Sequence, residues 1–501
     1  MKRFISVFII ILTLLCCSCA QTPRVTCYSH TDADNNGICD ECSVSVIVTV
    51  DLYAINDLHG KFGDTDADEG VDELTTYLKK MQLTNDYTII FSSGDMWQGG
   101  SESNLTRGGI ITEWMNDLGF AAMTLGNHEF DWGEGALESN ADLAEFPLLA
   151  INIFKNDTDE RVDYCSPSVV IKCGDIEIGI IGAIGDCYSS ISPDKVEDIY
   201  FKTGDELSAL VKAESQRLRG EGVDVIVYSM HDGHDQSKNG TGVITDNALD
   251  GYYDLDLSLG GYVDIVFEGH THKYYTLMDS SGVYHLQDGG DNRGISHAEL
   301  DVNSANGNIR VTEAEFVDST TYERLEDDRI VADLLEKYKD VVAVGQSVLG
   351  NNAKKRNSNF ICQLVAELYF AKGKELWGEE YGVVLGGGYI SIRSPYSLAT
   401  GEVTYSMLQS ILPFDNQLVL CSIKGSDLRR RFIESNNSNY FCAYDGDLTS
   451  QIEDNKTYYI VVDSYSSSYA PNRLTEITRY DANVFARDLL AEYIKQGGLD
   501  K

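Results

Sequence analysis

Five apolar runs in the first part of the chain each end in a short turn that carries Asp, His or Asn. The runs occupy residues 46–55, 86–91, 121–125, 223–230 and 263–267, with helix-like segments at 72–82, 108–119 and 206–219 between them. Short β-rich runs that alternate with helices predict a layered α/β domain. In open α/β sheets, ligands bind outside the carboxyl ends of the strands, so we expect the five turns to converge on one edge.

The turns hold side chains that bind divalent metal ions. In chain order these are Asp57, His59, Asp95, Asn127, His231, His270 and His272. Imidazole and carboxylate suit zinc, manganese and similar ions, and one carboxylate can bridge two ions. Asp95 is the best candidate for the bridge, and a metal pair ~3.5–4 Å apart can clamp a phosphoryl group. One such turn alone would indicate a capped turn or a structural histidine, whereas five in order predict a two-metal centre. His285 and His297 belong to no motif, and we expect structural roles for them.

A second domain follows a change of pattern near Ser319. The 501 residues suffice for two or three domains. Apolar residues at helical spacing predict a connecting helix within 319–345. After it, strands are predicted near 382–387, 417–425 and 458–464, and an amphipathic helix over 483–498. We therefore divide the chain into a first domain at 46–318, the linker helix at 319–345 and a second domain at 346–501.

The amino terminus has the pattern of a secretory signal. Lys2 and Arg3 precede an apolar run at 4–15 that is too short to span a bilayer comfortably. Cysteines with small neighbours follow, as in a lipoprotein cleavage box, with Cys19 the first candidate for lipidation and Cys17 the second. Residues 1–19 are thus predicted to be a lipoprotein-like signal peptide. The mature protein is expected outside the cytoplasm, touching the membrane only through a lipid anchor.

Residues 20–45 hold a cluster of soft ligands. Cys27 and His30 form one close pair, and Cys39 and Cys42 form another. Two such pairs on short turns can build a tetrahedral structural zinc site. Disulfides and a disordered tether are the alternatives.

The net charge of −40 argues against a nucleic-acid polymer as partner. A small anion can still bind where a metal ion or a few arginines invert the local field.

The motifs "INDLHG", "SSGD", "GNHEFD" and "GHTH" together resemble the calcineurin-like metallophosphoesterases. With the later "GGG…R" and "LPFDN", the chain from residue 46 onward resembles the secreted bacterial 5'-nucleotidases, which include UDP-sugar hydrolases and 2',3'-cyclic phosphodiesterases. The resemblance implies a four-layer β-sandwich metallophosphoesterase domain flanked by helices, then a linking helix and an α+β substrate-binding domain.

The resemblance also implies roles for the residues. Asp57, His59, Asp95 and His272 would bind one metal ion, and Asp95, Asn127, His231 and His270 the other. His128 would stand beside the phosphate, where it stabilises the transition state or protonates the leaving oxygen, with Asp131 orienting its ring. Asp131 could also cap the following helix, and the two roles can coexist. Glu129 is expected to support the site.

The substrate residues follow from the same resemblance. Asn127 and Arg393 would contact phosphate, Phe414 and Tyr465 would stack on the base, and Asn416 would contact it, with Tyr469 the next candidate for the second ring. The glycines at 386–388 are expected to let the backbone approach the ligand. Two extra residues before Arg393 and a missing Gly-Gly-Asp depart from the family pattern and leave the base and sugar open.

The predicted function is an extracytoplasmic two-metal phosphohydrolase that releases phosphate from nucleoside 5'-monophosphates and scavenges nucleotides. The alternatives are a 2',3'-cyclic nucleotide phosphodiesterase or UDP-sugar hydrolase and, in another class, a surface nucleotide-binding or adhesion protein with incidental catalysis.

Overall fold

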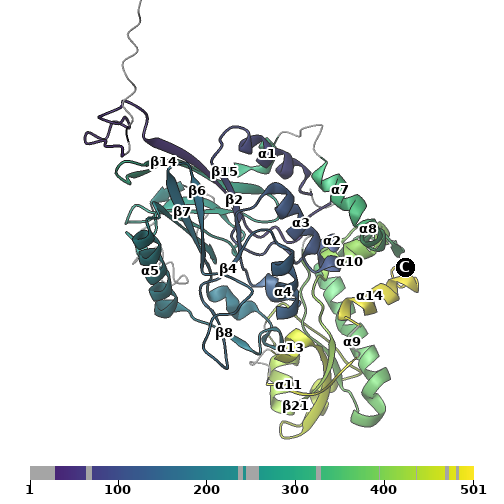
Figure 1. Ribbon diagram of the computed structural model, residues 1–501. Helices are drawn as coiled ribbons and strands as arrows, with labels where there is room; N and C mark the ends of the chain where they lie inside the picture. The colour runs from purple at the N-terminus through teal and green to yellow at the C-terminus, as the bar shows by residue number, and fades with distance from the viewer. Residues whose placement is uncertain are drawn as a thin grey trace, which may run out of the picture.

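The computed structural model describes residues 27, 29–63, 70–234, 241–243, 259–322, 329–393, 395–435, 437–468, 473–480 and 484–500. The predicted signal peptide, Cys17 and Cys19 lie outside the described residues. No helix in these ranges is long and apolar enough to cross a bilayer. Figure 1 shows the larger part of the chain built around two sheets and a smaller carboxyl-terminal part built around a third.

The first sheet has six strands in the order β15-β14-β1-β2-β3-β4. β1, β2, β3 and β4 run parallel, and β14 pairs antiparallel with β1 and with β15. The strands are β1 (Ile47–Ile55), β2 (Thr88–Ser92), β3 (Ala122–Thr124), β4 (Leu148–Leu149), β14 (Gly294–Asn303) and β15 (Ile309–Asp318). The carboxyl ends of β1, β2 and β3 therefore lie at one edge, as the sequence predicts.

The second sheet has seven strands in the order β10-β12-β13-β11-β9-β7-β6. Its centre, β7, β9, β11 and β13, is parallel. The strands are β6 (Ser168–Cys173), β7 (Ile176–Ile184), β9 (Val225–His231), β10 (Thr241–Val243), β11 (Ile265–Phe267), β12 (Tyr274–Met278) and β13 (Tyr284–Asp288).

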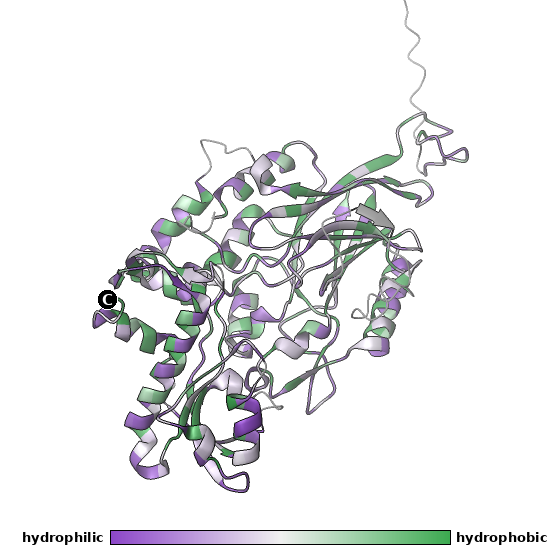
Figure 2. Ribbon diagram, turned by 180° about the vertical axis from the view of Figure 1, so that it is seen from behind, coloured by the Kyte–Doolittle hydropathy of each residue, from purple (hydrophilic) through white to green (hydrophobic). Residues whose placement is uncertain are grey.

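The two sheets pack face to face, and helices cover their outer faces. Leu52, Phe91 and Phe267 belong to the core between the sheets, where the rings of Phe91 and Phe267 meet edge to face at 5.0 Å. Helices α1 (Asp72–Gln82) and α3 (Gly109–Leu118) cover the first sheet, and α5 (Gly204–Glu221) covers the second. Figure 2 shows the hydrophilic and hydrophobic sides of α5. This is the four-layer arrangement that the family resemblance implies.

The predicted connecting helix is two helices. α7 (Ile330–Lys337) ends at Tyr338, and α8 (Lys339–Gly345) begins directly after it. The Tyr338 hydroxyl donates a hydrogen bond to Glu113 of α3 at 3.0 Å. Tyr338 itself lies outside the helical region, with φ −98° and ψ 21°. α7 buries Val331 and Leu334 against α1 and α3, and α8 packs beside α2 (Ser101–Thr106).

The third sheet has five strands in the order β22-β18-β23-β21-β24. The long helix α9 (Ser358–Tyr381) packs against it, and α14 (Ala486–Lys495) packs against α9. The strands are β18 (Leu385–Tyr389), β21 (Leu418–Lys424), β22 (Tyr440–Ala443), β23 (Thr457–Asp463) and β24 (Thr475–Arg479).

The glycines at 386–388 lie inside β18, where a Cβ on Gly386 would strike the backbone of Phe370 in α9. A Cβ on Gly387 would strike the Phe441 carbonyl, and one on Gly388 would lie 2.6 Å from the Ser466 hydroxyl oxygen. The glycines thus permit close packing of the strand on its protein neighbours, and their expected approach to a ligand stays a prediction.

Candidate active site

The structure brings all seven predicted metal ligands to one edge of the first domain. Asp57 and His59 follow β1, Asp95 follows β2, Asn127 follows β3, His231 ends β9, and His270 and His272 follow β11. Three groups of these side chains place their ligand atoms within 4.8 Å of one another: Asp57, His59 and His272; Asp57, Asp95 and His231; and His231 and His270 with Cys187. The shared members connect the groups into one cluster.

One half of the cluster centres on Asp57. Its Oδ1 lies 3.2 Å from His272 Nε2, and His59 Nε2 lies 3.1 Å from the same nitrogen. His59 Nδ1 donates to the Gln98 carbonyl at 2.9 Å. That bond places the lone pair of His59 on Nε2, toward the other two ligands, as a metal-binding imidazole requires.

The other half centres on Asp95 and His231. Asp95 Oδ2 lies 3.1 Å from His231 Nε2, while His231 Nδ1 donates to the Ser93 carbonyl at 2.6 Å. His231 Nε2, Asn127 Oδ1 and Asp57 Oδ1 are all buried and make no hydrogen bond of good geometry. His231 Nε2 and Asp57 Oδ1 instead face other ligand atoms of the cluster, Asp95 Oδ2 and His272 Nε2. Buried polar atoms normally have hydrogen-bond partners, so nitrogen and oxygen atoms gathered in this way at three strand ends fit divalent metal ions.

The ligands are held in a costly backbone conformation. Asp57, His59, Asp95, His270 and His272 have φ angles of 51°, 50°, 56°, 69° and 53°. Left-handed backbone is uncommon outside glycine and clusters at functional sites. The neighbouring glycines make room for the ligands, since a Cβ on Gly94 would lie 2.6 Å from His231 Nδ1 and one on Gly126 would strike the Asp95 carboxylate.

Glu129 joins two of the ligand loops. Its Oε2 accepts the N–H groups of Asp95 at 2.8 Å and Gly126 at 2.7 Å, and its Oε1 accepts those of Met96 at 2.8 Å and Trp97 at 3.3 Å. The residue is fully buried. Glu129 therefore fixes the loop after β2 against the loop after β3, which gives a definite form to the supporting role expected from the sequence.

His128 and Asp131 form a pair beside the cluster. His128 Nδ1 donates to Asp131 Oδ2 at 2.8 Å, and the His128 backbone N–H donates to Asp95 Oδ1 at 2.8 Å. Burial alone would lower the pKa of His128, but the carboxylates of Asp131 and Asp95 raise it above its ordinary value. Asp131 does not cap the next helix, because α4 (Glu134–Leu143) begins after Gly133 and has no side-chain cap. The helix-cap alternative for Asp131 is therefore wrong.

A sixth strand end also reaches the cluster. Asp288 ends β13, and Asp291 Oδ2 lies 3.8 Å from His272 Nδ1. Asp291 was not found from the sequence, because the "VYHLQ" that precedes "DGGDN" is not an apolar run like those before the other ligand turns. Cys187 was missed as well; its thiol donates to the His231 carbonyl at 2.8 Å, and no sequence motif points to it.

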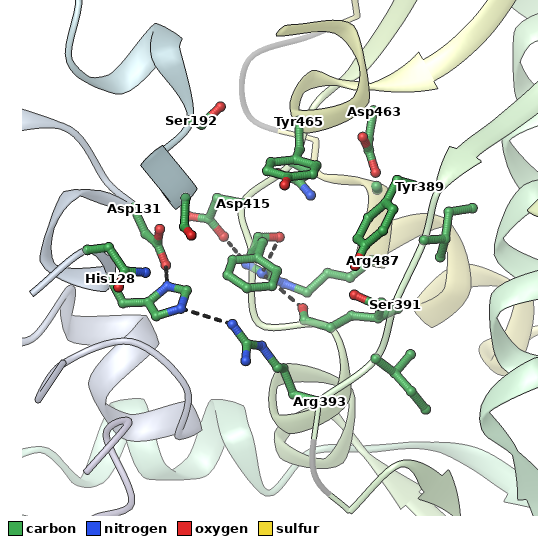
Figure 3. Close-up of a pocket in the computed structure, with 18 of the residues that line it drawn as sticks. His128, Asp131, Ser192, Tyr389, Ser391, Arg393, Asp415, Asp463, Tyr465 and Arg487 are labelled. Carbon is green, nitrogen blue, oxygen red and sulfur yellow. Dashed lines mark hydrogen bonds and ion pairs between the residues drawn. The ribbon is translucent and has the colours of Figure 1, made fainter. Parts of the chain in front are cut away.

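A cavity of about 380 Å³ extends from the cluster to the second domain. Three groups of residues line it. They are the metal ligands Asp95, Asn127, His270 and His272, the His128–Asp131 pair, and the four predicted substrate residues of the second domain, Arg393, Phe414, Asn416 and Tyr465. Figure 3 shows His128 and Asp131 on one side, Tyr389 and Tyr465 on the other, and Arg393 reaching toward His128. Tyr469 lies outside the described residues.

Arg393 and Phe414 meet at the boundary between the domains. Arg393 Nη2 donates to His128 Nε2 at 2.9 Å, and its guanidinium carbon lies 5.4 Å from the centre of the Phe414 ring. Across the cavity, the rings of Tyr389 and Tyr465 are 5.9 Å apart. The cavity thus offers a cationic end beside the metal ligands and aromatic walls beyond it.

Arg487 of α14 holds the Phe414 loop and was not found from the sequence. Its guanidinium donates to the carbonyls of Pro413 at 3.0 Å and Phe414 at 3.1 Å, and to the Asp415 carboxylate. Its side chain is only 4% exposed. The sequence contains no local signal for it, because Arg487 lies more than seventy residues after this loop.

The calcineurin-like phosphoesterase family matches residues 51–274 of this chain. The chain is 26% identical to "Endonuclease YhcR" of Bacillus subtilis over 76% of its own length, and it spans only 32% of that relative. It is 25% identical to "Protein UshA" of Yersinia enterocolitica (76% of this chain, 75% of that one) and 26% identical to the 5'-nucleotidase of Homo sapiens (76% and 70%).

Among solved structures, the fold matches that of a 5'-nucleotidase precursor from Thermus thermophilus with a TM-score of 0.65. That match covers 89% of this chain and 96% of the other at 18% identity. It supports the two-domain architecture.

Proposed function

We propose that the chain is a metal-dependent phosphoric monoester hydrolase that acts on nucleoside 5'-monophosphates outside the cytoplasm. Its similarity to the 5'-nucleotidase and UshA proteins and the match to the calcineurin-like phosphoesterase family support the proposal. One observation carries the proposal. The predicted metal ligands and a second-domain set of an arginine, aromatic rings and an amide line the same cavity. A phosphate at the metal end would leave the base among the aromatic side chains.

The first domain supplies the residues that hold the metal ions. Asp57, His59, Asp95 and His272 would hold one ion; Asp95, Asn127, His231 and His270 would hold the other, with Asp95 shared. Once bound there, two divalent ions stabilise the charge that develops on the phosphoryl group. The buried atoms of Asp57, Asn127 and His231 that make no hydrogen bond are the observation that supports this assignment.

His128 and Arg393 would bind the phosphoryl group and handle its proton. Asp131 accepts from Nδ1 of His128, so Nε2 faces Arg393 and the cavity. Arg393 Nη2 and His128 Nε2 lie 2.9 Å apart at the same place on the cavity wall. When His128 is protonated both groups are donors, and an anionic oxygen that accepts from both would replace their direct contact. From this place the Nε2 proton of His128 can pass to the leaving oxygen of the ester.

The second domain would select the nucleoside. Phe414 and Tyr465 supply ring faces, and each base–ring stacking contact contributes roughly 1–3 kcal/mol. Asn416 supplies an amide in the same cavity. The signal-like segment with Cys19 supports a location outside the cytoplasm, where such an enzyme would release nucleosides and phosphate for uptake.

Phosphate release from four substrates tests the proposal. The purified protein is stripped of metal with a chelator and given AMP, UDP-glucose, 2',3'-cyclic AMP or an aryl phosphate, with and without manganese or zinc. AMP is expected to be the best substrate, with turnover restored by metal. Turnover of the aryl phosphate alone would overturn the nucleotide assignment and keep the metal centre. If 2',3'-cyclic AMP or UDP-glucose is the best substrate, it would replace the nucleoside 5'-monophosphate as the proposed substrate. Metal binding without turnover of any of the four would favour a nucleotide-binding protein over an enzyme.

A further inference from the structure

A second group of metal-type ligands lies before the first strand, apart from the active site. The side chains of Cys27, His30, Cys39 and Cys42 place one ligand atom each within 4.8 Å of all the others. We propose that these four residues bind one zinc ion as a closed, structural site. Nothing in the comparisons assigns this site, because the matched family begins at residue 51.

The distances fit a tetrahedron around zinc. With Zn–S bonds of ~2.3 Å and Zn–N bonds of ~2.0–2.1 Å, two sulfur ligands lie ~3.8 Å apart, and a sulfur and a nitrogen ligand ~3.6 Å apart. Cys27 Sγ and Cys39 Sγ are 3.8 Å apart, and Cys42 Sγ and His30 Nδ1 are 3.5 Å apart. A disulfide requires ~2.05 Å between sulfurs. Three thiols cannot form two disulfides among themselves, so one cysteine of the cluster would remain unpaired in that alternative.

The backbone around Cys39 and Cys42 forms a closed turn. The Cys39 carbonyl accepts from Ser43 N–H at 2.9 Å, and its own N–H donates to the Val44 carbonyl at 2.8 Å. The Asp40 N–H donates to the Thr31 carbonyl at 2.8 Å, which joins this turn to the segment that carries His30. The two halves of the cluster are therefore held together by backbone hydrogen bonds as well as by their ligand atoms.

The cluster is packed on the first domain and is not a free tether. The buried Asp32 carboxylate accepts from Gly37 N–H at 2.9 Å and from the Asn303 amide at 2.7 Å. Asn306 and Asn308, in the turn between β14 and β15, donate to Asn35 at 2.7 and 2.9 Å. In Figure 1 this amino-terminal segment sits at the far end of β14.

The position indicates a structural role. The cluster precedes the start of β1, and the catalytic ligands follow its end. A strand of nine residues spans ~30 Å. With four protein ligands the site has no open position for a substrate. The zinc would therefore fasten the segment before β1 to the β14–β15 turn and take no part in phosphate release.

Cobalt substitution in the chain of residues 20–501 tests the proposal. A cobalt–thiolate site gives a near-ultraviolet charge-transfer band, which the oxygen and nitrogen ligands of the catalytic centre cannot give. We expect the band in the wild type and its loss in a Cys39→Ser/Cys42→Ser variant, which should also bind one zinc ion fewer per chain. Turnover of the aryl phosphate should stay within twofold of wild type.

Two controls keep the test decisive. Cys187→Ala removes the thiol beside the catalytic ligands and should retain the band. His30→Ala keeps every cysteine and should still lose one zinc ion per chain. Absence of the band in the reduced wild type, its survival in the double variant, or a disulfide between Cys27 and Cys39 in zinc-free secreted protein would overturn the proposal.

Discussion

The five metal ligands in left-handed backbone conformation show how the site differs from an ordinary set of turns. Such a conformation costs on the order of 1–3 kcal/mol for a non-glycine residue. Hydrogen bonds from the surrounding loops hold it, as where Asp57 N–H donates to the Gly94 carbonyl and His59 N–H donates to the Asp95 carbonyl. The ligand side chains are therefore placed before any ion binds.

His128→Ala should separate chemistry from metal binding. The variant is expected to keep its metal ions and to lose turnover of AMP by roughly 10²–10⁴-fold, because the proton donor is gone. The loss should be smaller for an aryl phosphate, whose leaving group needs no proton. Steady-state kinetics and metal analysis check this; equal losses for both substrates would contradict proton transfer by His128.

Glu129→Gln should weaken metal binding although Glu129 touches no ion. The new amide would turn a donor toward backbone N–H groups that now donate to the carboxylate. Loss of such support typically lowers metal affinity about 10–100-fold. Titration with manganese checks this, with Glu138→Gln on the exposed side of α4 as the matched control. Equal manganese affinity in the two variants would refute the positioning role.

His285 gives the stability of the first domain a defined pH dependence. Burial lowers the pKa of His285, but the carboxylates of Glu268 and Asp279 raise it to about 9, above the ordinary 6.5. Because its pKa is raised in the folded state, protonated His285 adds to the free energy of unfolding. This contribution is complete below pH 6.5 and is lost as the pH rises through about 9. The stability difference between wild type and His285→Gln should thus shrink by on the order of 3 kcal/mol over that range. Urea unfolding at several pH values measures it; a constant difference would be inconsistent with the charged histidine.

At the scale of elements, the substrate end of the cavity depends on contacts between segments far apart in the chain. The loop that carries Phe414 and Asn416 follows α10 (Tyr405–Ile411) and is fixed by α14. The Ala486 N–H donates to the Asn416 carbonyl at 2.7 Å, and the Ser464 N–H donates to the Gln417 carbonyl at 2.9 Å. The last helix of the chain thereby supports the base-binding loop.

Arg487→Met tests this support. Without the guanidinium, the carbonyls of Pro413 and Phe414 lose their side-chain donor and the partly buried Asp415 carboxylate loses its partner. We expect the KM for AMP to rise about tenfold, the equivalent of roughly 1.4 kcal/mol, with kcat for the aryl phosphate within twofold. Lys495→Met, on the exposed side of the same helix, should change neither value. Parallel loss of activity on both substrates would mean that Arg487 serves general stability.

At the scale of the whole molecule, the two domains share one catalytic surface. The contacts across their boundary include Arg393 with His128 at 2.9 Å, Arg479 with Asp194 at 3.2 Å, and Ser192 with Ser468 at 3.3 Å. The cavity has walls from both domains, so the first domain alone would retain the metal ligands and lose the aromatic walls. The relative position of the domains thus determines whether phosphate and base can bind together.

Metal removal should lower the thermal stability of the protein. The folded site holds the buried carboxylates of Asp57 and Asp95 together on strained backbone, and bound ions offset the free-energy cost of that arrangement. The unfolded chain does not contain this site, so the ions stabilise only the folded state. Ions at 100 times their Kd contribute about 2.7 kcal/mol. For a domain of this size that corresponds to a fall in Tm of roughly 5–10 °C on chelation. Differential scanning fluorimetry with and without manganese checks it, and Asp95→Asn should show a much smaller manganese effect. An unchanged Tm after chelation would argue against ion binding at this cluster.

The sequence by itself determined the elements of the first domain and the residues that end its strands. The predicted helix at 72–82 matches α1, and the ligand turns follow β1, β2, β3, β9 and β11. This succeeded because apolar periodicity is local, and because the carboxyl ends of parallel strands necessarily share an edge.

Only the tertiary structure decided what depends on contacts between distant segments. It showed that Glu129 joins two loops, that Arg487 holds the Phe414 loop, that the glycines of β18 admit close neighbours, and that the linker is interrupted at Tyr338. It also placed Cys27 and His30 against Cys39 and Cys42 at tetrahedral distances. Periodicity and turn signals report on near neighbours in the chain, whereas these features arise from packing and hydrogen bonds between residues that only the folded chain brings together.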